Sequence, residues 1–286
     1  MRYSLLWIFS LFLSCSLTDS DDVTPTFLNV SEVTVSPEPN QGSGSHNIED
    51  LWVIVDGALV GIHQFPSKIP VLKTAASPTE LRIFGGIRRN GINSDAIEYP
   101  FYQQIIQPID LIEGETINLD VEFKYRTDAT FAFVESFDNS NNFTQDEDGN
   151  PMTSFVSSNE DPREGFASGV GKVDAENSVL ELATDASFSD LPTNGAAIFL
   201  EMEYRSNLTL NVGLIGSLGT IPLKNYFLFL KPTGNSWNKI YVELTSEILG
   251  SNLDAYKLVF GIEYNGEDTN GAEGFLNLDN VKVIHF

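Results

Sequence analysis

The sequence has one cysteine, three histidines and only 16 lysine and arginine residues among its 286 residues. A single cysteine excludes an internal disulfide framework and any metal site built from several cysteines. Because 40 Asp and Glu residues leave a formal net charge of −24, the field of the protein repels phosphate, which makes nucleic acid and anionic membrane surfaces poor partners. The apolar run at residues 5–13 is too short to cross a bilayer, which takes about 20 residues.

The sequence also lacks the short motifs of common catalytic sites. It contains no Gly-x-Ser-x-Gly, no His-Glu-x-x-His and no phosphate-binding glycine loop. His46, His63 and His285 are far apart in the chain, and each is interpreted as a polar surface residue. We therefore predict that the protein is not an enzyme. The carboxylate pair Glu201 and Glu203 leaves a glycoside hydrolase as a minor alternative, although two adjacent and equally exposed acids lack the different environments that an acid and a base need.

What the chain does have is enough apolar material to fold. Hydrophobic residues make up 42% and aromatic residues 11% of the sequence, which is too much for a disordered chain despite the charge. A chain of this length predicts one or two domains with ample core.

The first residues indicate an exported, lipid-anchored protein. Arg2 precedes the apolar run at residues 5–13, and Ser14 then stands directly before Cys15. This resembles a bacterial lipoprotein signal peptide at residues 1–14, which implies that Cys15 is acylated (a palmitate-type modification) and becomes the first residue of the mature chain. An ordinary secretory signal with an incidental cysteine is the alternative. The absence of any later cysteine favours the lipid, because an exported protein with disulfides needs at least two.

Residues 15–24 form an acidic tether behind this anchor. Its sequence, with Asp19, Asp21 and Asp22, resembles the acidic tag that sends many Bacteroidota lipoproteins to the outer face of the outer membrane. The resemblance implies a location in the outer membrane with exposure at the cell surface. A plain solvated linker is the alternative, since short acidic runs are common in linkers.

The mature chain is predicted to be all-β. Residues 27–35, 51–55, 58–62, 81–84 and 117–125 have strand composition, and Asp56-Gly57 supplies a tight primed turn between two apolar runs. Glycine-rich residues 85–91 are expected to form a loop. We interpret residues 25–126 as one small β domain. Through "WVIVDGALVG" and "ELRIF" it weakly resembles the PEGA/Ig-like modules of bacterial surface proteins.

Residues 127–286 are predicted to be a second domain, an antiparallel β-sandwich. After a long polar stretch at 138–163, strands are expected at 197–205, 208–215, 225–231, 238–244, 256–264 and 275–286. The segments "FLEMEYRSNLTLNVGLI", "SWNKIYVELTSEI" and "FLNLDNVKVIHF" resemble the strands of a jelly-roll domain of uncharacterised Bacteroidota lipoproteins. That domain is similar in plan to jelly-roll carbohydrate-binding modules, and the likeness covers about residues 130–286.

Two strands of the sandwich carry polar and aromatic residues on their non-core faces. Such residues need something to cover them. One interpretation is a ligand platform on which a sugar ring stacks while charged groups bind its hydroxyls. The other is that a loop or the first domain covers this face, and that its charged residues form cross-strand ion pairs. The candidate ligand-binding residues are Trp237, Tyr241, Lys239, Glu201, Glu203 and Arg205.

The jelly-roll resemblance also implies a weak structural Ca²⁺ site. Its ligands would be Glu135 in "FVESF" and Asp279 in "NLDNV", with backbone carbonyls completing the shell. A surface acid and a turn-capping aspartate are the alternative roles of these two residues. No other cofactor is expected.

The function that these observations favour is a cell-surface lipoprotein acting as a non-catalytic binding module, with a carbohydrate or another extracellular polymer as its ligand. The alternative is an accessory or structural subunit that docks on a protein complex, such as a barrel complex, of the outer membrane. No nucleic-acid partner is expected.

Overall fold

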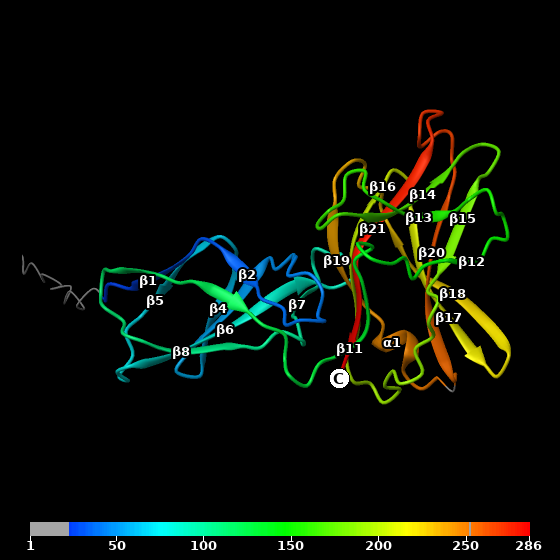
Figure 1. Ribbon diagram of the computed structural model, residues 1–286. Coiled ribbons are helices and arrows are strands. Elements are labelled where there is room, and N and C mark those ends of the chain that lie inside the picture. Colours follow the sequence, from blue (N-terminus) through cyan, green and yellow to red (C-terminus); the bar gives the residue numbers. More distant parts are fainter. Residues whose placement is uncertain (1–22, 252) are drawn as a thin grey trace, which may run out of the picture.

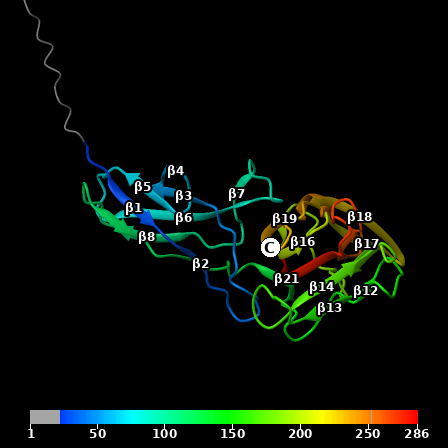
Figure 2. The same ribbon diagram turned by 90° about the horizontal axis from the view of Figure 1, so that it is seen from above.

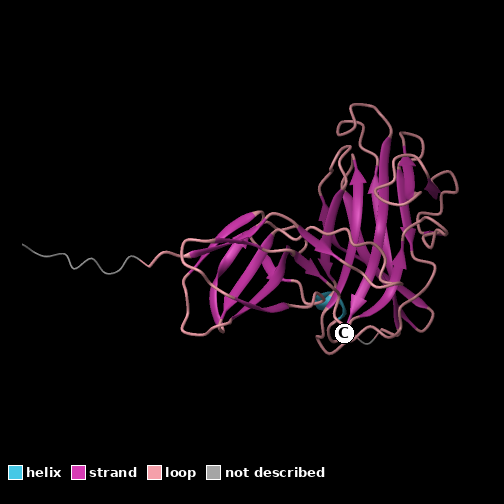
Figure 3. Ribbon diagram, turned by 60° about the vertical axis from the view of Figure 1, so that its left-hand side comes forward, coloured by secondary structure: helices cyan, strands magenta, loops and turns pink. Residues whose placement is uncertain are grey.

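The computed structural model describes residues 23–251 and 253–286, and strands account for nearly all of its regular structure (Figure 3). The signal peptide predicted at residues 1–14, the predicted lipidation site Cys15 and most of the tether predicted at 15–24 lie outside the described residues. Within the described part, no helix has the length and apolar character needed to cross a membrane. The all-β class predicted from the sequence is confirmed.

The N-terminal unit is built from three small sheets around one core. Its largest sheet has the strand order β4-β3-β6-β7, with β8 also paired to β6. The other two sheets are β5-β1-β9 and β10-β2. The strands of this unit are β1 (Thr26–Val30), β2 (Val33–Val35), β3 (Asp50–Val55), β4 (Ala58–Gln64), β5 (Ser67–Val71), β6 (Thr79–Arg88), β7 (Ala96–Glu98), β8 (Ile105–Ile109), β9 (Thr116–Asn118) and β10 (Val121–Phe123).

The hairpin between β3 and β4 forms as its sequence predicts. Asp56 and Gly57 have φ angles of 47° and 79°, and Val55 pairs with Ala58 directly across the two-residue turn. Asp and Gly tolerate positive φ better than other residues, which is why this dipeptide suits the turn.

Two of the secondary-structure predictions for this unit need correction. The strands predicted at 27–35 and 117–125 are each divided, because their first halves pair with one another in one sheet and their second halves pair in another. Gly86, expected in a loop, instead continues β6 and pairs with Asp50 of β3. Its missing side chain leaves room for the indole of Trp52, whose Nε1 would lie 3.1 Å from a Cβ at this position.

The C-terminal unit is a two-sheet sandwich (Figure 1). One sheet has the order β13-β14-β21-β16-β19, with β11 also paired to β21, and the other has the order β12-β15-β20-β17-β18. The strands are β11 (Thr130–Glu135), β12 (Gln145–Asp146), β13 (Phe155–Ser158), β14 (Ser168–Val173), β15 (Val179–Ala183), β16 (Ile198–Ser206), β17 (Leu210–Leu218), β18 (Ile221–Leu230), β19 (Asn238–Glu243), β20 (Ala255–Glu263) and β21 (Gly274–His285), and the helix is α1 (Thr245–Ile248).

Alternating side chains of the two sheets fill the core of the sandwich. In β16, Leu200 and Met202 point into this core, and Val212 and Phe260 meet them from the second sheet. In a β-strand, every second side chain points to the same face of the sheet. The sandwich therefore has two outer faces that point away from this core. One lies on β16, β19 and β21, and the other lies on β15, β20, β17 and β18.

The two units pack directly against one another at the first of these faces (Figures 1 and 2). The backbone N–H of Asn90 in the N-terminal unit donates a 2.8 Å hydrogen bond to the carbonyl of Tyr241 on β19. Phe199, Tyr241 and Ile284 of the C-terminal unit belong to the core of the N-terminal unit. Apolar packing across the boundary therefore joins the two units.

Candidate functional site

The face predicted to be a ligand platform is covered by the N-terminal unit. Glu201 pairs with Tyr241 across β16 and β19, and Glu203 pairs with Lys239. The sequence therefore predicted correctly which residues of these strands share the non-core face. Glu201 is 0% exposed and Tyr241 is 1% exposed. The expected open platform is wrong for these strands, because the first domain buries them, as the alternative interpretation allowed.

Glu201 is the centre of a buried polar cluster at the boundary. The hydroxyl of Tyr99 donates to its Oε1 at 2.7 Å, and the hydroxyl of Tyr125 lies 3.0 Å from both carboxylate oxygens. Lys239 Nζ lies 3.0 Å from Oε2, and Lys282 Nζ lies 4.0 Å from the same oxygen. Burial alone would raise the pKa of Glu201, but the two lysines and the hydrogen bond from Tyr99 lower it below its ordinary value. Glu201 is therefore an ionised carboxylate that serves packing between the units.

Tyr241 and Glu203 are also held by contacts within the chain. The Tyr241 hydroxyl lies 3.2 Å from that of Tyr102 and accepts a 3.1 Å hydrogen bond from the backbone of Asn47. Glu203 accepts hydrogen bonds from Ser45 at 2.6 Å and Arg163 at 2.9 Å. Because Glu201 and Glu203 are both enclosed in this way, the pair considered for glycoside hydrolysis cannot reach a glycosidic bond while the units are docked.

Arg205 and Trp237 lie at the margin of the same sheet, outside the covered area. The guanidinium carbon of Arg205 lies 5.2 Å from the centre of the Trp237 ring, and Arg205 also forms an ion pair with Asp161. The Arg205 side chain is only 12% exposed, and Trp237 is half-buried. Of the six residues predicted to bind ligand, Arg205 lines an open hollow, which has a volume of about 280 Å³.

The structure does not bring Glu135 and Asp279 together as a calcium site. Glu135 accepts hydrogen bonds from the backbone of Phe137 at 2.6 Å and of Asn142 at 2.8 Å, whereas Asp279 accepts them from the loop at 163–164. These N–H donors point at the oxygens that a cation would need, so the two residues do not fit Ca²⁺. Residues 23–251 and 253–286 contain no group of three or more His, Cys, Asp or Glu residues placed to hold a metal.

The histidine expectation also needs one correction. His285 is buried rather than on the surface, because it ends the central strand β21 and pairs with both β11 and β16. His46 and His63 are half-buried.

An aromatic platform does exist on the outer face of the second sheet. Phe229 pairs with Asn211, and Tyr226 pairs with Gly213, because a bulge between Val212 and Gly213 leaves Phe227 as the extra residue. Residues 226 and 229 of a regular strand would face opposite sides, but the bulge turns both side chains outward. Phe229 is 62% exposed.

Polar groups surround this platform. The Tyr226 hydroxyl donates to Oε1 of Glu181 at 2.8 Å, and Lys224 Nζ donates to Oε2 of the same carboxylate at 2.5 Å. The Tyr226 ring lies over two glycines: a Cβ at Gly213 would come within 2.8 Å of the ring, and one at Gly261 would lie 3.0 Å from the hydroxyl. We name the surface made by Tyr226, Phe229, Glu181, Asn211 and Lys224 the outer platform.

The sequence analysis missed the outer platform, although it held two signals for it. The run Tyr226-Phe227-Leu228-Phe229 has three aromatics in four residues, and glycines interrupt the strands predicted at 208–215 and 256–264. An isolated glycine in a strand indicates a bulge or a close approach. The position of the bulge, however, depends on pairing between strands that the sequence alone does not specify.

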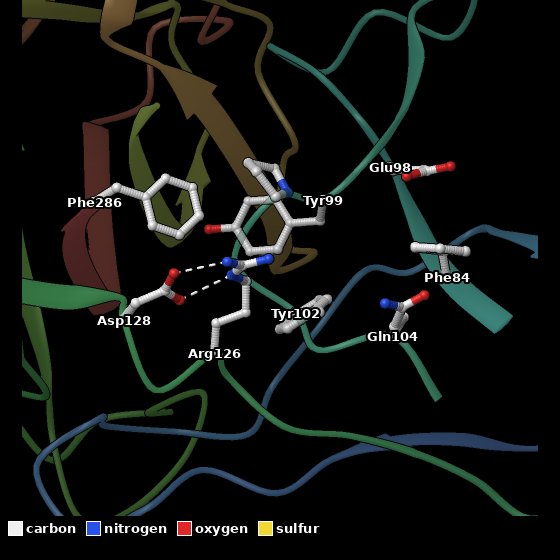
Figure 4. A pocket seen from close by; sticks show the side chains of 9 residues that line it. Phe84, Glu98, Tyr99, Tyr102, Gln104, Arg126, Asp128 and Phe286 are labelled. Carbon is white, nitrogen blue, oxygen red and sulfur yellow. Dashed lines mark hydrogen bonds and ion pairs between the residues drawn. The ribbon is translucent and has the colours of Figure 1, made fainter. Parts of the chain in front are cut away.

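A cleft also opens beside the boundary between the units (Figure 4). Its volume is about 580 Å³, within the range of about 300–1,000 Å³ that is usual for small-ligand sites. Arg126 forms a two-pronged ion pair with Asp128, at 2.9 and 2.7 Å. The lining residues are Phe84, Glu98, Tyr99, Pro100, Tyr102, Gln104, Arg126, Asp128 and Phe286.

Comparisons with known proteins find likeness only at the level of three-dimensional structure. No family model and no curated protein matches the sequence. The CBM22-1 xylan-binding domain of Paenibacillus barcinonensis Xyn10C has a TM-score of 0.39 and 12% identity, with 55% of this chain and 95% of that domain covered. The C-terminal family 22 carbohydrate-binding module of Clostridium thermocellum Xyn10B has a TM-score of 0.37 and 14% identity, covering 54% of this chain and 91% of the module.

A phage protein is similar to the same extent. The enzymatically active domain of tailspike protein 4 from bacteriophage CBA120 has a TM-score of 0.39 and 14% identity, with 53% of this chain and 20% of that chain covered. Likenesses of this size do not carry over a ligand or an activity.

Proposed function

We propose that this protein is a non-catalytic binding protein for a carbohydrate chain, and that the outer platform is where the carbohydrate binds. The observation that carries the proposal is the bulge at Phe227 of β18, opposite Val212 and Gly213 of β17, which places Tyr226 and Phe229 on one open sheet face. Phe229 is 62% exposed beside the half-buried ring of Tyr226, and an exposed apolar group on an open face of this kind favours a binding surface.

The chemistry of the outer platform suits a sugar. A pyranose ring has an apolar C–H face that packs on an aromatic side chain and a rim of hydroxyls that are both donors and acceptors. Tyr226 and Phe229 supply the apolar surface, Glu181 supplies acceptors, and Lys224 and Asn211 supply donors. Because Tyr226 is already held by Glu181 and by the glycines beneath it, little side-chain entropy is lost on binding.

The location proposed for the protein is the cell surface, through a lipid on Cys15. Acyl chains provide the anchoring that a net charge of −24 cannot. In Figure 1 the described chain begins at the end of the N-terminal unit that lies away from the sandwich. A tether at that end would hold the outer platform away from the membrane, where a polymer can reach it.

Binding to immobilised glycans tests the proposal. We expect that Tyr226→Ala and Phe229→Ala each weaken binding by about tenfold or more, since loss of an aromatic contact costs about 1–3 kcal/mol at such a surface. Phe166→Ala is the matched control, because Phe166 is an exposed phenylalanine of the same unit outside the platform. Equal glycan binding by all three variants and the unmodified protein would contradict the proposal.

A second candidate function is docking on an outer-membrane protein complex. It is favoured by the apolar tip of the β17–β18 hairpin, where Leu218, Ile221 and Leu223 are all exposed. If the protein co-purifies with an outer-membrane barrel, loses this partner on Ile221→Ser, and binds no glycan, this second function is the right one.

A further inference from the structure

The cleft of Figure 4 continues from the outer face of the largest sheet in the N-terminal unit. Phe84 of β6 lines the cleft and pairs with Trp52 of β3, which in turn pairs with Ile62 of β4. Residues paired across strands share a face. An aromatic strip of Trp52 and Phe84 therefore leads from the sheet face into the cleft.

Polar side chains of the N-terminal unit and of the connection to β11 line the cleft, and Phe286 of the sandwich borders it. Figure 4 shows Glu98 and Gln104 near Phe84, and Arg126 with Asp128 below Tyr99. The guanidinium of Arg126 lies 5.1 Å from the centre of the Phe286 ring. Together these residues present hydrogen-bond acceptors on the carboxylates, donors on the guanidinium, and both a donor and an acceptor on the side-chain amide.

The floor of the cleft is rigid because it is part of the contact between the units. The Tyr99 hydroxyl is bonded to Glu201 and the Tyr102 hydroxyl to that of Tyr241. Both tyrosines are almost fully buried. The cleft thus exists only when the units are docked, and a ligand does not have to order it.

Charge decides which class of ligand the cleft admits. Asp128 neutralises Arg126, so Glu98 leaves the lining with a net negative charge. The whole chain is strongly acidic. Phosphorylated, sulfated and uronic-acid ligands are therefore repelled, whereas a neutral polyhydroxylated ligand meets both donors and acceptors.

We propose that this cleft is a second carbohydrate site, which takes a neutral saccharide with a C–H face against Phe84 and hydroxyls on Glu98, Gln104, Arg126 and Asp128. This second proposal rests on the proposed function only in assuming that the ligand is a carbohydrate, since the cleft shares no residue with the outer platform. A chain with two such sites binds a polymer by avidity, because the second contact becomes intramolecular after the first.

Calorimetric titration of the full chain with neutral cello-, xylo- and manno-oligosaccharides tests the second site. The unmodified protein is expected to bind two saccharides per chain. The double variant Glu98→Ala/Gln104→Ala and the cleft-filling variant Gln104→Trp are expected to bind one, with the remaining affinity unchanged, or to bind the second about tenfold more weakly, as the loss of one or two hydrogen bonds implies. Both altered positions are exposed, and thermal unfolding checks the fold.

The controls separate this proposal from the proposed function. Gln64→Ala and Glu122→Ala remove an exposed amide and an exposed carboxylate of the same unit that lie outside the cleft, and both should still bind two saccharides. If the unmodified protein binds one saccharide and both cleft variants bind it equally well, the proposal for the cleft is overturned and the proposal for the outer platform stands. A site lost in the cleft variants but kept in Tyr226→Ala/Phe229→Ala would overturn the platform and support the cleft. No binding of any saccharide would overturn both.

Discussion

The hydroxyl of Tyr125 lies 3.0 Å from both carboxylate oxygens of Glu201, across the boundary between the two units. Lys239 and Lys282 approach the same carboxylate from the sandwich side. Glu201 thus balances two buried lysines and receives hydroxyl donors from the other unit. The face that carries it is the means by which the units are joined.

Glu201→Ala is expected to destabilise the protein strongly. Removing one partner of a buried ion pair leaves an uncompensated charge and typically costs about 3–5 kcal/mol. Tyr125→Phe removes the hydroxyl that donates to Glu201 and accepts from Lys282, and should cost about 1–3 kcal/mol. Free energies of unfolding from chemical denaturation measure both. Glu122→Ala is the control, because Glu122 is exposed, and its effect should stay within about 0.5 kcal/mol; a similar small effect of Glu201→Ala would show that the cluster does not stabilise the docked units.

Asp279 predicts a pH dependence of stability. Burial raises the pKa of its carboxyl from 3.8 to about 7, against the backbone N–H groups of Glu164, Asn280 and Arg163, and the charge of Glu203 adds to the rise. Between these two pKa values the folded state holds a proton that the unfolded state releases. The contribution of Asp279 to stability is therefore largest below pH 3.8 and is lost as the pH rises from about 4 to 7.

Asp279→Asn should remove this dependence. The measured quantity is the difference in unfolding free energy between Asp279→Asn and the unmodified protein at several pH values from 4 to 8, so that other titrating groups cancel. As the pH rises through this window, Asp279→Asn should become more stable relative to the unmodified protein. A difference that stays constant with pH would mean that the pKa of Asp279 is close to its ordinary value.

Gly213→Ala is expected to disturb the outer platform. An added Cβ would lie 2.5 Å from the carbonyl oxygen of Asn225 and 2.8 Å from the Tyr226 ring, so the ring and the bulge must shift, at a cost of about 1–3 kcal/mol. Glycan affinity should fall with the stability. At Gly266 the nearest atoms would be 3.6 Å away, so Gly266→Ala serves as the control and should bind as the unmodified protein does. If Gly213→Ala binds glycan as tightly as the unmodified protein, the position of the Tyr226 ring does not matter for binding.

Cys15→Ser is expected to abolish lipid attachment. Metabolic labelling with a fatty acid should label the unmodified protein in the producing cells and not the variant, and the variant should leave the membrane fraction. Protease added to whole cells should cleave the anchored protein if it lies on the outer surface. Labelling of Cys15→Ser would contradict lipidation at this residue.

Local patterns in the sequence determined much of the fold. Alternation in β16 and β19 identified which residues point into the sandwich, and Asp56-Gly57 identified a tight turn. Both depend on covalent geometry and on neighbours within a few residues. The same patterns placed Glu201, Lys239 and Tyr241 together on one face, which the structure confirms.

The tertiary structure alone decided what those faces contact. Whether Tyr241 meets solvent or Tyr102 depends on how two units dock, and these residues are separated by 139 positions. Whether Tyr226 and Phe229 face the same way depends on a bulge that pairing with β17 creates. Parity is a property of one strand, whereas coverage and register are properties of strands in contact. For that reason the sequence determined the faces of this protein, and only the packing of its units decided which of them are left open to a ligand.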